Sequence, residues 1–252
     1  MSLTNISLCF PEFSDKQRRQ LTMASLIETG KSITEMGPAW FYPAEKLLNK
    51  ITGFENREIL EWAIAKQQGI IFMTPHLGCW EIAGLYMANR LPLTSLYRPP
   101  RIQNLENLIT QARQRTGAKL VPTTTSGVKA LFAALAKTET IGILPDQDPG
   151  DDGGIFAPFF GHDANTMKLI PKLAHKTGVP VILVVAKRKP FGQGYIMSYH
   201  KADEKIYSSD LLEAATAMNL SIENCVRENP KQYQWSYKRF KRQPKGKSSL
   251  YT

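Results

Sequence analysis

Residues 69–84 read GIIFMTPHLGCWEIAG, and this stretch joins a short apolar run to an amphipathic segment. The run GIIFMT over 69–74 is bounded by a glycine and a proline, which is typical of a strand buried on both faces of a sheet. His76 comes directly after this strand, and Glu81 follows five residues later. Ligands in parallel α/β sheets bind beyond the carboxyl ends of the strands, so His76 lies where a site is expected.

The same pattern of short apolar runs and longer amphipathic segments continues along the chain. It predicts strands over 69–74, 93–97, 118–121, 140–144, 180–187 and 195–200, and helices over 55–67, 79–89, 103–115, 125–137, 166–177 and 209–228. Strands that alternate with helices indicate βαβ units. The sequence therefore predicts an α/β fold with a largely parallel central sheet flanked by helices.

A helical region is expected ahead of this core. Ser14 caps a predicted helix that runs through DKQRRQLTMASLIETGKSITEM, and Pro43 breaks a shorter helical region that follows. The first helix has an apolar side supplied by Leu21, Ala24, Leu26 and Ile27. We predict one domain over 1–252, made of an N-terminal helical region (1–49), an α/β core (50–228) and a basic C-terminal tail (229–252).

The composition is that of an ordinary globular protein. The chain has 252 residues, of which 42% are hydrophobic and 21% charged, which excludes intrinsic disorder. Its formal charge of +10 attracts anionic partners such as phosphorylated ligands, lipid headgroups, nucleic acid or an acidic protein. The N-terminus does not resemble a signal peptide, and no apolar run approaches the roughly 18 residues that span a bilayer. Three widely spaced cysteines indicate neither a metal site nor a disulfide framework.

Part of the positive charge is concentrated at the C-terminus, where aromatic residues stand between the cations. This tail fits either a solvated basic segment or one that binds an anionic membrane or phosphate. Nucleic-acid binding uses the same residue types, so the tail alone does not separate these partners. The cations are Lys231, Lys238, Arg239, Lys241, Arg242, Lys245 and Lys247, and the aromatic residues are Tyr233, Trp235, Tyr237 and Phe240.

His76 and Glu81 can form a catalytic pair if His76 lies in the turn and Glu81 in the first turn of the next helix. The carboxylate would then accept the imidazole N–H and stabilise the imidazolium, as in the histidine–acid half of a hydrolase triad. No G-x-S-x-G motif supplies a serine, so a hydroxyl of the substrate can be the nucleophile, as in an acyltransferase. Two alternatives remain open: a purely structural histidine, and Cys79 as the nucleophile rather than a small buried thiol.

The sequence does not match the known metal-binding and cofactor-binding motifs. There is no H-E-x-x-H, and the other histidines have no ligand spacing relative to His76. The acidic stretch PDQDPGDDGG (145–154) departs from the calcium-loop template, and GQGYIM (192–197) lacks the third glycine of a dinucleotide fingerprint. We predict neither a metal nor a cofactor.

Several blocks of the sequence resemble one known family. TPHLGCWEIAG resembles the H-x4-D/E block of the glycerolipid acyltransferases, specifically that of the late (secondary) lipid A acyltransferases of Gram-negative bacteria. Further blocks are similar in the same order, so the resemblance covers nearly the whole chain. They are LYRPPR (96–101), GILPDQDPGDDGGIFAPFFGHDANTM (142–167) and TGVPVILVVAKR (177–188), with flanking segments over 5–21 and 229–244.

The resemblance implies an acyltransferase α/β sandwich and a reaction. A fatty acyl group would move from an acyl-carrier-protein thioester to a hydroxyl of a Kdo-bearing lipid A precursor. By motif matching, His76 would be the general base and Glu81 its orienting partner. Arg98 would contact substrate or phosphate, and Arg101 is a weaker candidate for the same role. Asp146 and Gln147 would shape the substrate site, completing the predicted set.

The resemblance also implies partners and a location. We expect acyl carrier protein, a lipid A precursor or related glycolipid and an anionic membrane surface as partners, and no nucleic acid. Family members usually begin with a hydrophobic anchoring segment, whereas this chain starts almost at NISLCFPE. Either the anchor was removed or the protein binds peripherally to the cytoplasmic face of the inner membrane. Cys79 also occupies a position where a polar residue such as asparagine is common.

Other functions remain as alternatives. The acceptor can be another glycolipid or a lysophospholipid, or water can replace it in a thioesterase. A basic membrane- or nucleic-acid-binding module without chemistry is the alternative from a different class, and it would not need His76.

Overall fold

The computed structural model describes residues 1–98 and 103–251. The chain divides into two compact units that are interleaved along the sequence. One, called here the sheet unit, comprises Ser32–Leu144 and Val179–Lys201. The other, called the hairpin unit, comprises Met1–Lys31, Pro145–Gly178 and Ala202–Thr252. The predicted division of the chain into consecutive regions stays a prediction.

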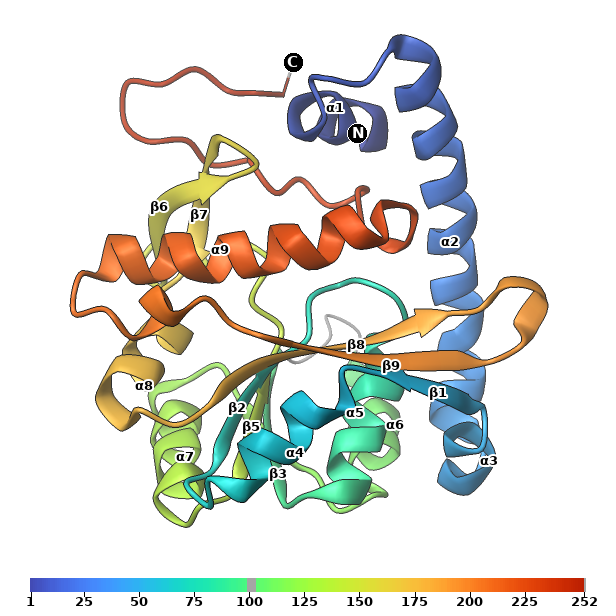
Figure 1. Ribbon diagram of the computed structural model, residues 1–252, viewed down its shortest axis with the longest axis vertical. Helices are drawn as coiled ribbons and strands as arrows, with labels where there is room; N and C mark the ends of the chain where they lie inside the picture. The colour runs from blue at the N-terminus through green and yellow to red at the C-terminus, as the bar shows by residue number, and fades with distance from the viewer. Residues whose placement is uncertain (99–102, 252) are drawn as a thin grey trace. The chain divides into compact units, whose positions relative to one another are not determined.

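The sheet unit contains a seven-stranded sheet with the order β1-β9-β8-β2-β5-β3-β4 (Figure 1). All neighbouring strands are parallel except β8 and β9, which pair antiparallel. The predicted α/β class with a largely parallel sheet is therefore confirmed. The strands are β1 (Ile51–Glu55), β2 (Ile70–Met73), β3 (Leu93–Tyr97), β4 (Lys119–Pro122), β5 (Thr140–Ile143), β8 (Val181–Arg188) and β9 (Tyr195–Lys201).

Helices connect these strands as the sequence predicts. The carboxyl end of β2 leads into α5, and β4 leads into α7, whose N-cap Thr124 accepts a hydrogen bond from the Gly127 N–H. The Pro43 break is confirmed, because one helix ends at Phe41 and the next begins at Ala44. The helices of this unit are α3 (Ala44–Leu48), α4 (Arg57–Ala65), α5 (Trp80–Arg90), α6 (Gln103–Gln114) and α7 (Thr125–Ala136), with a short 3₁₀ turn η1 (Pro190–Gly192).

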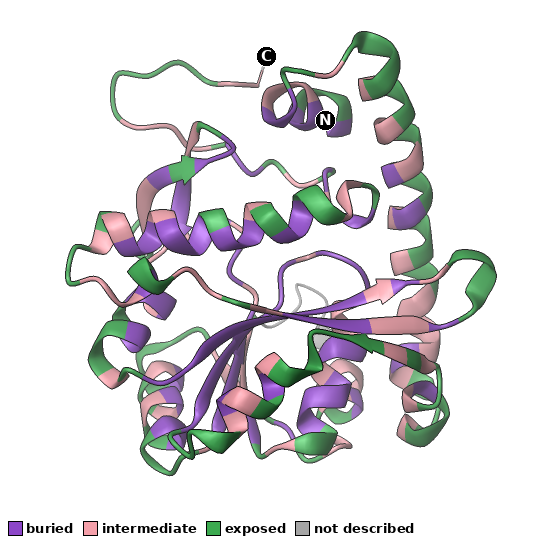
Figure 2. Cartoon of the chain, in the orientation of Figure 1, coloured by how far each residue is buried: buried purple, intermediate pink, exposed green. Residues whose placement is uncertain are grey.

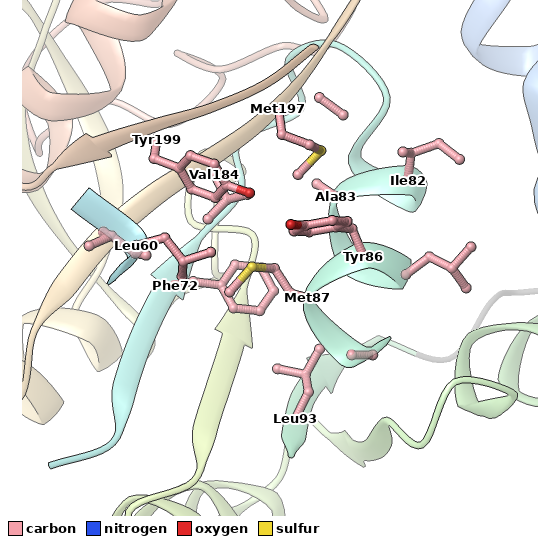
Figure 3. Packing of buried hydrophobic residues seen from close by; sticks show 14 of the residues in the cluster. Leu60, Phe72, Ile82, Ala83, Tyr86, Met87, Leu93, Val184, Met197 and Tyr199 are labelled. Atoms are coloured by element: carbon pink, nitrogen blue, oxygen red, sulfur yellow. The ribbon is translucent and has the colours of Figure 1, made fainter. Parts of the chain in front are cut away.

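The core of the sheet unit lies between α4, α5 and one face of the sheet. Figure 3 shows Phe72 of β2 and Val184 of β8 packed with Tyr86 and Met87 of α5. Every side chain of β2 is at most 3% exposed, because helices or loops cover both faces of this central strand. Each such side chain contributes about 1.5–3 kcal/mol through its burial. The position of the β2 end is thus strongly determined.

The hairpin unit is built around an antiparallel pair and a long helix. Strands β6 (Gly154–Phe159) and β7 (His162–Met167) form the hairpin, and α9 (Leu211–Glu228) packs against β6. The Asn219 side chain donates hydrogen bonds to the Pro158 carbonyl oxygen and to Thr166 Oγ1, which ties the helix to both strands. The remaining elements are α1 (Ser2–Cys9), α8 (Leu169–Thr177), η2 (Glu204–Tyr207) and η3 (Pro230–Gln232). Helix α2 (Asp15–Phe41) is continuous and contributes to both units.

The sequence prediction was wrong at several elements. β1 was not predicted and lies just after the expected N-terminal helical region. The hairpin β6–β7 was not predicted either, and its last two residues overlap the helix expected from 166. The hairpin sequence has no clear apolar alternation and contains residues that disfavour strands. Its two-residue turn places Phe160 at φ 48° and Gly161 at φ 77°, the conformation of a type I′ turn. Helix α1 was not predicted.

The aromatic residues of the C-terminal tail belong to the core of the hairpin unit. Trp235, Phe240 and Tyr233 are at most 5% exposed. The Arg239 guanidinium is buried with them and donates hydrogen bonds to the Asn165 carbonyl oxygen and Thr166 Oγ1. The interpretation of these three aromatic residues as contacts to an anionic interface is therefore wrong. The exposed cations of the tail are Lys231, Lys238, Lys241, Lys245 and Lys247.

The turn after β2 depends on one glycine. Gly78 has φ +65°, and a Cβ atom there would overlap the Ala186 carbonyl oxygen of β8. We predict that Gly78→Ala lowers the free energy of unfolding by more than ~1 kcal/mol, because alanine is strained at positive φ and also clashes. Urea unfolding of the full chain measures this loss.

Gly84→Ala is the matched control for that experiment. Gly84 lies within α5, and a Cβ atom there meets no described neighbour within 4 Å. A glycine-to-alanine change inside a helix adds ~0.5–1 kcal/mol of stability. If Gly78→Ala unfolds at the same urea concentration as the unchanged protein, close packing does not constrain the turn.

Candidate active site

The candidate site begins at the turn between β2 and α5. The Cys79 N–H donates a hydrogen bond of 2.9 Å to the Ala186 carbonyl oxygen, which fixes this turn to β8. The Thr74 N–H donates to the Ile143 carbonyl oxygen of β5 at 3.1 Å. The end of β2 is thus held from both neighbouring strands. As the sequence predicts, His76 lies in the turn and Glu81 in the first turn of α5.

His76 is half-buried beside Trp80, the first residue of α5. The centroids of their two rings lie 5.0 Å apart with an interplanar angle of 59°. This contact restricts the orientation of the imidazole, while the half-buried position leaves the ring accessible to a ligand. Such a position suits a general base, which must contact its substrate directly.

Glu81 is bound by an arginine that the sequence analysis did not single out. The Arg113 side chain, on α6, donates from Nε to Glu81 Oε2 at 3.0 Å and from a terminal nitrogen to Glu81 Oε1. A bidentate pair of this kind fixes both oxygens of the carboxylate. Burial alone would lower the pKa of Arg113, but the charge and hydrogen bonds of Glu81 together raise it. The guanidinium therefore stays charged beside the carboxylate.

A second arginine adds positive charge near Glu81. Arg115 donates a hydrogen bond to the Trp40 carbonyl oxygen at 3.2 Å. Burial lowers the pKa of Arg115, and the charge of Glu81 partly offsets that effect. No sequence motif marks Arg113 or Arg115, because their proximity to Glu81 depends on how α6 packs against α5.

A mostly apolar pocket adjoins the Glu81–Arg113 pair. It encloses about 630 Å³, including the solvent at its mouth. At one wall of the pocket, Gly142 allows Phe72 and Ser95 to pack closely, because a Cβ atom there would lie 2.6 Å from the Phe72 ring and 2.8 Å from Ser95 Oγ. Its lining comes from α2, β2, α5, β3, α6, β4 and β5: Ala39, Phe72, Thr74, Trp80, Glu81, Gly84, Leu85, Leu93, Ser95, Leu96, Tyr97, Ala112, Arg113, Ala118, Leu120, Gly142 and Leu144.

An ion pair fastens the C-terminal half of α2 to the sheet unit. Arg188 of β8 donates from Nε to both oxygens of Glu35 at 2.8 Å, and from a terminal nitrogen to Ser32 Oγ at 2.8 Å. The Tyr195 hydroxyl donates to the same carboxylate at 3.0 Å. Arg188 is nearly buried, so this network places α2 firmly beside the turn that bears His76.

Cys79 lies next to that network and is 4% exposed. Burial, followed by the charge of Glu35, raises the pKa of its thiol to about 12. A protonated, buried thiol is a poor nucleophile. The structure supports the interpretation of Cys79 as a small buried side chain.

The other predicted site residues lie in different parts of the chain. Arg98 is exposed just beyond the end of β3, and Arg101 lies outside the described residues. Asp146 and Gln147 belong to the hairpin unit. Asp146 is buried, and its charge, after burial itself, contributes to the raised pKa of Tyr233. Gln147 donates a hydrogen bond to the Gln234 side chain at 3.1 Å.

Comparison with known proteins identifies the family. The family model of the bacterial lipid A biosynthesis acyltransferases matches residues 1–242. The chain belongs to this family. It is therefore an acyltransferase of lipid A biosynthesis, as the resemblance implies.

Individual relatives differ in the acyl group that their names give. The chain is 31% identical over 248 residues to a lipid A biosynthesis palmitoleoyltransferase of Escherichia coli, covering 98% of this chain and 80% of the relative. It is 29% identical over 250 residues to the lauroyltransferase of the same organism, with the same coverage. Its identity to the myristoyltransferase is 24% over 258 residues, covering 99% of this chain and 77% of that relative.

Membrane-spanning helices and metal sites are both absent from the described part of the chain. Within residues 1–98 and 103–251, no helix combines the length and the apolar character needed to cross a membrane. Among the same residues, no group of three or more His, Cys, Asp and Glu side chains is arranged to hold a metal ion.

The Glu81–Arg113 pair can be tested by a double-mutant cycle. We predict a coupling energy on the order of 1 kcal/mol between Glu81→Gln and Arg113→Met, because each single change leaves a partly buried charge without its partner. Urea unfolding of the two single variants and the double variant gives this value.

The exposed pair Arg57–Glu61 on α4 is the matched control, with both side chains about half exposed. Its coupling should stay below ~0.5 kcal/mol, as is usual for such helix pairs. A Glu81–Arg113 coupling no larger than that of the control would show that the pair does not hold the site together.

Proposed function

We propose that this acyltransferase moves a fatty acyl group from an acyl-carrier-protein thioester to a hydroxyl of a lipid A precursor. His76 acts as the general base. The observation that carries the proposal is the position of His76: it lies in the turn after β2, five residues before Glu81, and Glu81 and Arg113 line an apolar pocket. This arrangement combines a base, fixed charges and room for a hydrocarbon chain.

The reaction needs one proton transfer in each direction. His76 takes the proton of the acceptor hydroxyl as its oxygen attacks the thioester carbonyl. The tetrahedral intermediate carries an oxyanion, which requires hydrogen-bond donors. As the intermediate collapses, the carbon–sulfur bond breaks and His76 returns the proton to the departing thiolate. Histidine suits both steps, since its ordinary pKa lies near neutral pH.

Glu81 supports the base electrostatically. A carboxylate near the imidazole stabilises the imidazolium that forms when the hydroxyl proton is taken. The bidentate contact from Arg113 holds this carboxylate in one orientation. We expect the loss from Glu81→Ala to approach that of removing a triad carboxylate, on the order of 10⁴-fold.

The pocket provides the site for the transferred chain. Apolar side chains make up most of its lining. Glu81 and Arg113 line the same pocket, together with residues of β3 and β5. A fatty acyl tail gains about 0.8 kcal/mol for each buried CH₂ group. The relatives are named for lauroyl, myristoyl and palmitoleoyl transfer. The transfer assay below measures the length of the acyl chain that this protein moves.

Charge supports the proposed partners. The formal charge of +10 favours acidic acyl carrier protein and an anionic membrane surface, and both contacts should weaken with salt. We propose that the protein acts at the cytoplasmic face of the bacterial inner membrane, where acyl carrier protein and lipid precursor are both available. Arg98, Arg101, Asp146 and Gln147 remain proposed substrate contacts.

A direct transfer assay tests the proposal. Purified full-length protein is incubated with lauroyl- and myristoyl-carrier protein and a tetra-acylated Kdo–lipid A precursor, and the lipid is read by mass spectrometry. We expect a mass gain of one acyl chain that His76→Ala abolishes, because no other group would take the hydroxyl proton. The exposed His175→Ala on α8 is the matched control and should keep full activity.

The same assay separates the alternatives. Release of free fatty acid that depends on His76, without a lipid product, would indicate a thioesterase. Transfer only to another glycolipid or a lysophospholipid would replace the acceptor but retain the mechanism. Turnover by His76→Ala at the unchanged rate would overturn the mechanism.

Arg98 gives a prediction about the acceptor. If its guanidinium binds an anionic group, Arg98→Lys should raise the apparent KM for the phosphorylated acceptor several-fold and change kcat little, since lysine cannot form the bidentate contact. Steady-state kinetics against acceptor concentration measures this effect. Arg57 is an exposed arginine on α4, so the control Arg57→Lys should leave KM and kcat unchanged. If Arg98→Lys also leaves KM unchanged, Arg98 does not contact the acceptor.

A further inference from the structure

Helix α2 exposes five large apolar residues. Met23 is 62% exposed, Ile27 56%, Ile33 62% and Phe41 67%, and Leu26 is 47% exposed. At 100° per residue, these five positions fall within an arc of roughly 120°. Figure 2 shows exposed positions recurring along the length of α2. These five residues are called here the α2 stripe.

The inner side of the same helix carries polar residues that contact the rest of the protein, beside apolar ones such as Ala39. Ser25 and Glu28 are buried in its N-terminal half. In its C-terminal half, Ser32 and Glu35 accept hydrogen bonds from Arg188. Polar contacts with Arg188 therefore hold the C-terminal half of the inner side. The α2 stripe remains as an apolar face, and large exposed apolar patches mark interaction sites.

We propose that the α2 stripe is the face by which this protein inserts into a bilayer that contains anionic lipid. Lys16 and Arg19 fall in the same arc at the start of the helix, and both are exposed. Basic residues beside a stripe of large apolar side chains are the features of a helix that lies in the membrane interface. Their long side chains can extend from the interface to phosphate groups.

Membrane contact through the α2 stripe is compatible with the proposed reaction, because the same helix also lines the pocket. Ala39, on the inner side of α2, lines the apolar pocket beside Glu81 and Arg113. A helix with its side chains is about 10–12 Å thick, so a stripe in the interface would keep the pocket within reach of a lipid. This inference rests on the proposed lipid acceptor, and it names the surface through which that acceptor arrives.

Binding to vesicles tests the inference with the full chain. The vesicles contain phosphatidylethanolamine and phosphatidylglycerol, and binding is measured by co-sedimentation at low and high salt. The triple variant Met23→Gln, Ile27→Gln, Ile33→Gln should bind at least about tenfold more weakly at high salt, where apolar insertion rather than charge dominates. Because the three side chains are exposed, the variant should retain the fold, and urea unfolding checks this.

The matched control changes exposed leucines elsewhere. Leu212 and Leu220 on α9 are 46% and 44% exposed, so Leu212→Gln, Leu220→Gln removes similar side chains from another surface. This control should bind vesicles within about twofold of the unchanged protein. If the triple variant binds vesicles as well as the control does, the proposal is overturned. It is also overturned if only the control loses vesicle binding.

A label measures insertion directly. Cys9, Cys79 and Cys225 are buried, so an environment-sensitive dye will react selectively with Ile27→Cys. Its emission should shift to the blue when vesicles are added, whereas the dye at Leu212→Cys should not respond. A blue-shifted signal at position 27 before vesicles are added, together with a dimer in sedimentation, would assign the stripe to self-association instead.

Transfer activity distinguishes the failure of this inference from that of the proposed function. With the acceptor in detergent micelles, the triple variant should keep the transfer rate of the unchanged protein. If the unchanged protein transfers no acyl group but its stripe still inserts into vesicles, the proposed reaction is wrong and the membrane face stands. If transfer occurs and the stripe variants bind vesicles normally, the membrane face is wrong.

Discussion

The hydrogen bond from the Cys79 N–H to the Ala186 carbonyl oxygen is the contact on which the site depends. It fixes the start of α5 against β8, and the close approach requires glycine at the preceding position, 78. With the first turn of α5 held there, Glu81 meets Arg113 from α6. His76 is carried by the same turn, between a completely buried strand and a fixed helix. The proposed base and its carboxylate partner therefore lie on backbone that is held by contacts with neighbouring strands.

The Glu81–Arg113 pair solves an electrostatic problem that a lone carboxylate would create. A carboxylate beside an apolar pocket is costly to desolvate. The bidentate guanidinium of Arg113 offsets this cost and holds both carboxylate oxygens of Glu81 in one orientation. In the proposed mechanism, Arg113 would act on His76 only through Glu81.

Sequence reasoning found the elements that have clear local signals. The buried strand of residues 70–73, the turn with His76 and the position of Glu81 in the first helical turn follow from apolar run length and from glycine and proline boundaries. The hairpin of residues 154–167 lacks such periodicity, since it is specified by a positive-φ turn and by contacts with a distant helix. Arg113 was missed for a related reason: it lies 32 residues from Glu81, and only the packing of two helices brings them together.

Helix α2 shows that the pattern of apolar residues does not by itself give the orientation of a helix. The sequence predicts an apolar side made of Leu21, Ala24, Leu26 and Ile27. In the structure Leu26 and Ile27 are exposed, whereas Leu21 and Ala24 are half-buried, because periodicity alone does not say which side faces the protein. That choice is made by a buried cation: Arg188 requires acceptors, and the serine and glutamate of α2 supply them at 2.8 Å. With Ser32 and Glu35 turned toward Arg188, Ile33 and Phe41 lie on the exposed side of the helix. An exposed apolar face suits a protein whose family modifies a lipid, and it is the surface that we propose for contact with the membrane.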